Sequence, residues 1–228
     1  MNRRDMMKTT GVGLFGVNFT NSSLAKDEEY VPISDVEQKQ INAVTVEPYL
    51  IQYIENPSEQ VQLAVVQQNG HIIRFIKNPS EQVQIAAAKK EGSAIRYIAN
   101  PSENVKLAAV QENGYAIRYI TNPSENVKLA AVQQSGYAIQ FIKNPSEQVQ
   151  TAAVEQDGYA IQFIKNPSEL LQIASLQSNR CAIAFMKNPS EEVQLAAVKR
   201  YAFSYINNPT DSVKLAAALQ YGLSIDLM

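Results

Sequence analysis

The chain has 228 residues, of which 45% are hydrophobic and 18% charged, and its formal net charge is −2. This composition excludes a disordered chain, and the nearly balanced charge excludes a general attraction for nucleic acid or anionic lipid. A single cysteine, Cys181, rules out an internal disulfide, and a single histidine, His71, leaves no residues with metal-ligand spacing, so we expect no metal and no cofactor.

The first 25 residues differ from the rest and have the parts of an export signal. Arg3 and Arg4 come before a short apolar stretch over residues 11–19, and the small residue Ala25 comes before a charged segment. The apolar stretch is too short to span a bilayer as a stable helix. We therefore expect residues 1–25 to be a signal peptide that is cleaved after Ala25, leaving residues 26–33 as a short lead segment.

This segment resembles a twin-arginine signal, whose motif is two arginines, a residue of any kind, two apolar residues and often a lysine. The residues that fit the motif are Arg3, Arg4, Met6, Met7 and Lys8, with methionine in place of the usual phenylalanine. The resemblance implies a periplasmic or secreted protein that has no membrane attachment once the signal is removed. If the signal does not function, the protein is cytoplasmic.

After this segment the motif Asn-Pro-Ser-Glu recurs every 22 residues, which is the signature of a tandem repeat. Counting each unit from its Asn as positions 1 to 22 divides residues 34–228 into nine units. The first unit begins at Ser34 in the same register, the eighth is two residues shorter, and the ninth begins with Asn-Pro-Thr-Asp. The units start at residues 34, 56, 78, 100, 122, 144, 166, 188 and 208.

Unit 4 shows how each unit is expected to begin. Asn100 precedes a proline, which favours an extended backbone, so we expect it to be the N-cap of a helix. Pro101 is expected at the first helical position, where its missing N–H is harmless. Glu103 follows three residues after the cap and is expected to bond back to it as a capping box. This structural role accounts for the motif, so we assign no catalytic role to its serine or glutamate.

The rest of unit 4 predicts two helices of unequal length. Residues 105–112 are rich in helix formers, and we expect Gly114 to end the first helix in a left-handed conformation. Residues 115–120 predict a second helix of fewer than two turns, which is not stable by itself.

Apolar residues recur at positions 6, 8, 9, 10 and 11 of the first helix and at positions 18, 20 and 21 of the second. One unit buries too little surface to fold alone, so burial must come from stacking the units. We therefore predict an all-α protein, a right-handed α-solenoid of about nine 22-residue two-helix repeats. In the first unit, the polar residues Lys39 and Asn42 stand at positions 6 and 9, which indicates a capping unit.

The run from Val105 to Ile120 resembles an uncharacterised bacterial helical-repeat family with units of the type Val-x-x-Ala-Ala-Val-x-x-Asn-Gly-x-Ala-Leu-x-Tyr. Its first half is also similar to HEAT-like and leucine-rich-variant repeats. The first family has no assigned activity, and the latter two are mainly protein-binding scaffolds. The resemblance therefore implies a helical-repeat scaffold, and it implies function only by analogy.

No set of residues in the sequence has the pattern of a catalytic site. His71 and Cys181 both stand at position 16, in units 2 and 7, and are therefore too far apart to form a dyad. Each takes the place of the usual tyrosine. We therefore expect a protein that is not an enzyme, with no catalytic residues.

The variable positions form stripes along the stack, and two of them hold residues that protein interfaces favour. Position 16 is usually tyrosine, and position 19 is arginine in three successive units. The candidate partner-binding residues are Arg74, Arg96, Tyr115, Arg118, Tyr137 and Tyr159. The alternative is that the tyrosines form a half-buried ladder and the polar residues only keep the stack soluble.

Three functions remain open. The leading hypothesis is an exported, non-enzymatic scaffold that binds a protein or peptide through its second helices. A nucleic-acid binder that uses the arginine and lysine stripe is the alternative, but a net charge of −4 after signal removal and the export signal argue against it. An enzyme with an unrecognised site is the least favoured.

Overall fold

The computed structural model describes residues 34–222, so the expected signal peptide and lead segment lie outside the described residues. Within this range α-helices alternate with short 3₁₀-helices. The α-helices are α1 Asp35–Val46, α2 Glu59–Gln68, α3 Glu81–Lys90, α4 Glu103–Glu112, α5 Glu125–Gln134, α6 Glu147–Gln156, α7 Glu169–Ser178, α8 Glu191–Lys199 and α9 Asp211–Tyr221. The 3₁₀-helices are η1 Pro48–Tyr53, η2 Gly70–Phe75, η3 Gly92–Tyr97, η4 Gly114–Tyr119, η5 Gly136–Phe141, η6 Gly158–Phe163, η7 Arg180–Phe185 and η8 Phe203–Tyr205.

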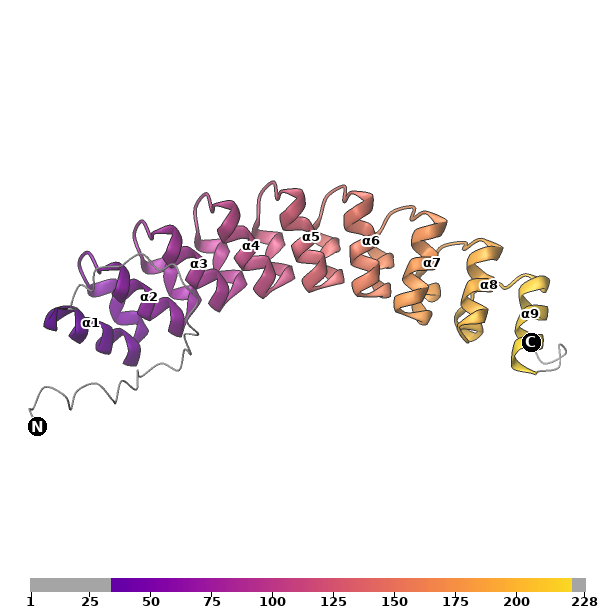
Figure 1. Ribbon diagram of the computed structural model, residues 1–228, viewed down its shortest axis with the longest axis horizontal. Coiled ribbons are helices and arrows are strands. Elements are labelled where there is room, and N and C mark those ends of the chain that lie inside the picture. The colour runs from indigo at the N-terminus through magenta and orange to yellow at the C-terminus, as the bar shows by residue number, and fades with distance from the viewer. Residues whose placement is uncertain (1–33, 223–228) are drawn as a thin grey trace, which may run out of the picture. The chain divides into compact units, whose positions relative to one another are not determined.

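Successive units stack in a row, as Figure 1 shows for residues 34–222. Each α-helix packs against the next α-helix, and each of η1 to η7 packs against both the α-helix and the 3₁₀-helix of the following unit. The prediction of an all-α solenoid of about nine two-helix repeats is confirmed. No helix within the described residues combines the length and the apolar character needed to cross a membrane.

In units 2 to 9 the predicted start of the first helix was wrong by two residues, whereas in unit 1 the N-cap is Ser34, the first residue of the unit, as expected. Ser102 is the N-cap of α4, and its hydroxyl accepts a hydrogen bond from the N–H of Val105 at 3.4 Å. Asn100 has a φ of 48°, so it lies in the left-handed region and caps nothing. Asparagine is one of the few residues other than glycine that adopt this region readily. The chain uses it at the turn between units, ahead of Pro101, and the same left-handed Asn recurs at each of the eight Asn-Pro pairs.

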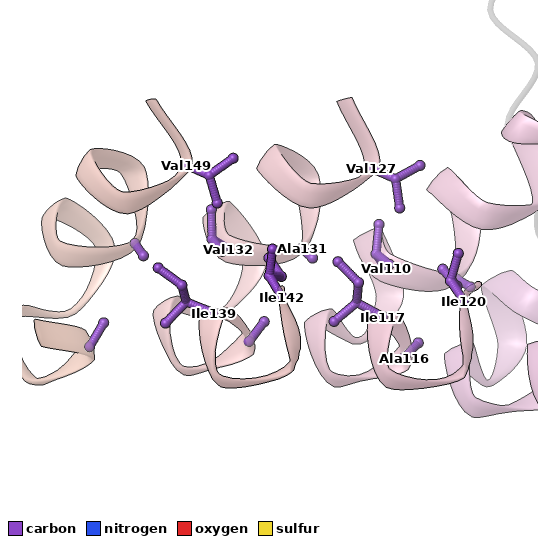
Figure 2. Close-up of a cluster of buried hydrophobic side chains, with 14 of the residues drawn as sticks. Val110, Ala116, Ile117, Ile120, Val127, Ala131, Val132, Ile139, Ile142 and Val149 are labelled. Carbon is purple, nitrogen blue, oxygen red and sulfur yellow. The ribbon is translucent and has the colours of Figure 1, made fainter. Parts of the chain in front are cut away.

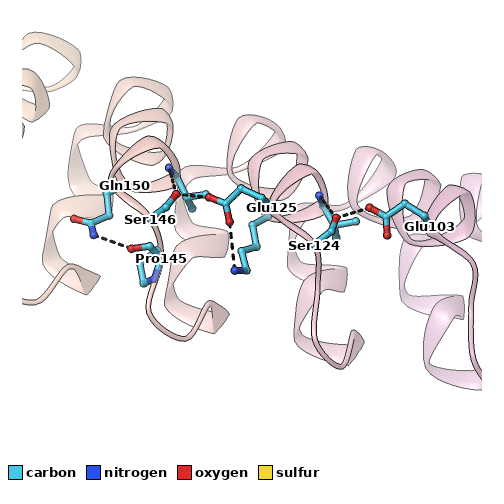
Figure 3. A network of polar contacts seen from close by, with 9 residues as sticks. Glu103, Ser124, Glu125, Pro145, Ser146 and Gln150 are labelled. Carbon is cyan, nitrogen blue, oxygen red and sulfur yellow. Dashed lines mark hydrogen bonds and ion pairs between the residues drawn. The ribbon is translucent and has the colours of Figure 1, made fainter.

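The predicted capping box is also wrong. Glu103 is the first residue of α4, and its carboxylate accepts a hydrogen bond from the hydroxyl of Ser124 in the next unit (Figure 3). The motif therefore joins units as well as starting helices. The same bond between position 4 and the next N-cap joins Glu37 to Ser58, Glu59 to Ser80, Glu81 to Ser102, Glu125 to Ser146, Glu169 to Ser190 and Glu191 to Thr210.

Gly114 does not adopt the predicted left-handed conformation. The first helix ends at Glu112, and its C-cap Asn113 is extended with a φ of −147°. The Asn113 side chain accepts a hydrogen bond from the N–H of Tyr115. A Cβ at Gly114 would lie 2.4 Å from the carbonyl oxygen of Ala131 in the next unit. Glycine is needed here because the second helix approaches the next α-helix too closely for a side chain.

The core lies between the two layers of helices and runs without a break from unit to unit (Figure 2). Positions 6, 10 and 11 of α2 to α9 are buried, whereas positions 8 and 9 are mostly half-buried. A 3₁₀-helix has three residues per turn, so positions 18 and 21 share one face, 17 and 20 a second, and 16 and 19 a third. The first of these faces points into the core, as the buried pair Ile117 and Ile120 shows.

The two ends of the array depart from the regular unit. Lys39 and Asn42 are exposed on α1, as expected of a first unit that has no neighbour before it. In unit 8 the missing two residues shorten the second helix to Phe203–Tyr205, and Tyr201 takes a φ of 57°. Units 7 and 8 pack less extensively than the pairs before them.

Candidate partner-binding face

Positions 16, 19, 20 and 22 of units 1 to 8 form one surface, which we call the second-helix face. Its floor is a row of aromatic side chains at position 20. Four of these rings are partly buried and pack against the core, and the other four are exposed, so the prediction that position 20 belongs to the core holds only in part. The row consists of Tyr53, Phe75, Tyr97, Tyr119, Phe141, Phe163, Phe185 and Tyr205.

The position 16 side chains pack against this row across the junctions between units. The ring of Tyr115 lies edge-on to that of Phe141 in the next unit, with centroids 5.8 Å apart. Tyr137 packs in the same way on Phe163 at 5.6 Å, and Tyr159 on Phe185 at 5.3 Å. Burial raises the pKa of the Tyr137 phenol, with smaller contributions from nearby charges. The three candidate tyrosines are thus half-buried contacts between units.

The three candidate arginines lie on the outside of the same rings. The guanidinium carbon of Arg96 is 4.9 Å from the ring centroid of Tyr97 in its own unit and 5.7 Å from that of Tyr119 in the next. Arg74 and Arg118 repeat this arrangement on Phe75 and Tyr97 and on Tyr119 and Phe141, respectively. These distances are within the range of cation–π attraction, which orders the guanidinium groups while leaving their N–H donors exposed.

A groove recurs between neighbouring second helices, next to the Asn-Pro pair that begins the following unit. Four of these grooves have volumes of 440 to 510 Å³. Each is lined by the isoleucines at positions 18 and 21, by the position 20 ring of the following unit and by the Asn-Pro pair. A glutamine at position 7 closes the base: in unit 6, Gln150 donates a hydrogen bond to the carbonyl oxygen of Pro145 at 2.9 Å (Figure 3).

The charges of this face have one predominant sign. Positions 19 and 22 of units 1 to 8 carry seven cations and one carboxylate, Glu55, a net of +6 in a chain whose net charge is −2. All seven cations are exposed, and none forms an ion pair or a side-chain hydrogen bond with another described residue. They are Arg74, Lys77, Arg96, Arg118, Lys143, Lys165 and Lys187.

Sequence reasoning missed one polar cluster. His71 Nε2 lies 2.9 Å from the hydroxyl oxygen of Ser93, and its Nδ1 contacts Oε2 of Glu91. The repeat pattern could have predicted this contact, because His71 and Ser93 stand at position 16 of successive units, and equal positions of neighbouring units lie side by side. His71 and Cys181 lie in units 2 and 7, as expected. Cys181 lies beside Tyr205 of unit 8, and a hydrogen bond with its thiol raises the pKa of the Tyr205 phenol.

This cluster does not amount to a catalytic triad. A serine beside a histidine has the distance of a nucleophile and its base, but Glu91 Oε2, although it contacts Nδ1, has no hydrogen-bond partner among the described residues. The neighbouring N–H of Gly92 already donates to Glu112 at 2.5 Å, so it is not free to stabilise an oxyanion. Within residues 34–222, no group of three or more histidine, cysteine or acidic side chains is placed to hold a metal ion.

Comparison of the chain with protein-family models, with curated proteins and with solved structures finds no match.

Proposed function

We propose that this protein is an exported, non-enzymatic helical-repeat scaffold that binds a protein or peptide partner along the second-helix face. The observation that carries the proposal is the recurrence of one open groove at the same place between neighbouring units. Each groove combines apolar side chains with a few polar groups, which is the composition of binding pockets. A partner that spans several units gains from each groove in turn, since the sites are joined in one chain.

Export rests on the sequence alone. Arg3 and Arg4 lie outside the described residues, and the support for export is their arrangement with the apolar stretch that follows. A partner in the periplasm or outside the cell is consistent with this signal.

Nucleic acid is the second candidate partner, and the row of exposed cations favours it. Two observations favour a protein or peptide instead. The chain as a whole is slightly acidic, and the ring faces in units 2 to 4 are covered by arginines, which leaves them unavailable for stacking with bases.

Site-specific photocrosslinking in cells of the source organism tests the proposed function. A photoreactive phenylalanine analogue replaces Phe163, which is 37% exposed and lines a groove of the second-helix face, or Gln133, which is exposed and lines a separate groove of about 490 Å³ between α5 and α6. We expect discrete protein adducts from position 163 and none from position 133. Adducts from position 133 alone, or equal labelling from both positions, would show that the second-helix face is not the binding surface.

A further inference from the structure

The cations of the second-helix face are distributed at one or two per unit. Arg74, Arg96 and Arg118 supply the charge at position 19 of units 2 to 4, and lysines supply it at position 22 of units 5 to 7. The charged position therefore changes from 19 to 22 half-way along the array. Every unit from 2 to 7 nevertheless has at least one exposed cation. We call this series, which includes Lys77, the cation row.

The cation row is available to a ligand. Its members have no carboxylate partner among the described residues. The glutamates at position 4 are the nearest large set of carboxylates in the sequence, and they accept hydrogen bonds from serines of the next unit instead. The arginines of the row are ordered by the rings beneath them, so they lose less freedom when they bind than free side chains do.

The spacing of the row sets the form of the ligand. Stacked helices lie about 10 Å apart, so cations at the same position of successive units are about 10 Å apart along the array. A peptide in the extended polyproline II conformation rises about 3.1 Å per residue with three residues per turn, so three residues cover about one unit and every third side chain points the same way. A nucleic-acid strand is a poorer match, because its charges follow one another at about 3.4 Å and most of them would face no cation.

We infer that the partner is an extended acidic segment of another protein, with a carboxylate side chain at every third residue opposite the cation row. The apolar walls of the grooves take the side chains between the carboxylates. This inference rests on the proposed function, since it names the chemical class of the partner that the second-helix face binds.

Fluorescence anisotropy with the full chain tests this inference. The probe is a labelled peptide of about 18 residues, six repeats of Glu-Ser-Val, which at three residues per unit spans units 2 to 7. A peptide of the same composition with its glutamates in one block is the spacing control, and a single-stranded DNA of equal length is the nucleic-acid control. We expect binding of the periodic peptide that weakens with salt, and at least about tenfold weaker binding of the blocked peptide and of the DNA.

Two variants of equal charge test the site. Arg96→Gln, Arg118→Gln and Lys143→Gln together remove three cations from the row, and we expect them to weaken binding about tenfold, since each exposed ion pair contributes modestly. Lys89→Gln, Lys90→Gln and Lys199→Gln remove three exposed cations from the α-helices, outside the row, and should leave binding within about twofold of the unchanged chain.

Equal weakening by both triple variants, or tighter binding of the DNA than of the periodic peptide, would overturn the inference. So would the absence of any binding of the periodic peptide. In that case the photocrosslinking result decides separately whether the second-helix face binds a partner of other chemistry.

Discussion

The side chain of Ile117 is 2% exposed and lies in the core, whereas that of Leu107, at position 8 of α4, is only half-buried. We expect Ile117→Ala to lower the free energy of unfolding by about 2–5 kcal/mol, because it leaves a closed cavity. Leu107→Ala should cost less, because its site is partly open to water. Chemical denaturation of the two variants measures both values. An equal loss would show that position 8 is as enclosed as position 18.

At the same scale, the hydrogen bond from the hydroxyl of Ser146 holds the pKa of Glu125 below its usual value, and Lys128 lowers it further. A lowered pKa means that this contact stabilises the fold above the ordinary pKa of the carboxyl group, and that the stabilisation is lost as the pH falls through the lowered value. We expect Ser146→Ala to raise the pKa of Glu125, as followed by carbon NMR of its carboxyl group. Ser102→Ala, two units away, is the control and should leave it unchanged.

The Asn-Pro-Ser-Glu motif shows what local reasoning could and could not predict. Its spacing predicted where every unit begins, because proline and capping residues punctuate helices regularly. The roles of its residues, however, were assigned two residues too early: Ser102 rather than Asn100 is the N-cap, and Glu103 rather than Pro101 is the first helical residue. The rule for a residue before proline favours an extended Asn100, but the turn between units imposes a left-handed one, and the bond from Glu103 to Ser124 depends on a neighbouring unit that no local pattern describes.

At the scale of the element, the second helix depends on close approach to the α-helix of the next unit. We expect Gly114→Ala to cost about 1–3 kcal/mol, because its Cβ would lie 2.4 Å from the carbonyl oxygen of Ala131 and one of the two helices must shift.

Ser135→Ala is the matched control for this substitution. Ser135 stands at position 14 of unit 5 and its side chain makes no capping hydrogen bond, so the change should stay within about 0.5 kcal/mol. Thermal unfolding of the two variants measures the difference. A Gly114→Ala variant as stable as the Ser135→Ala variant would show that glycine serves some other purpose at position 15.

The length of the second helix was predicted well, but its three faces were not. Six residues were expected and six are found, although at three residues per turn they make two full turns. An apolar aromatic at position 20, however, has the pattern of a core residue on any scale based on hydrophobicity. Only the 3₁₀ geometry separates position 20 from positions 18 and 21, and it places rings such as Phe163 at the surface. The candidate tyrosines likewise became contacts between units, because each reaches the ring of the following unit.

At the scale of the whole molecule, the stacking of the units followed from the sequence because one unit cannot bury enough surface to fold alone. The export of the molecule is a separate prediction. We expect Arg3→Lys together with Arg4→Lys to leave the precursor inside the cell, since the resemblance to a twin-arginine signal implies that transport depends on both arginines. Cell fractionation and N-terminal sequencing check this outcome. A mature protein that begins at Met1 would contradict it.

In the proposed function the second-helix face binds a partner, while the core holds the array together. A variant that tests binding without disturbing the stacking of the units changes only arginines, because Tyr115 and Tyr137 also hold neighbouring units together. The measurement is a pair of values for the variant with Arg74, Arg96 and Arg118 changed to glutamine: its melting temperature and the yield of the adduct from a photoreactive group at position 163. We predict a nearly unchanged melting temperature and loss of the adduct. An undiminished adduct at an unchanged melting temperature would contradict the claim.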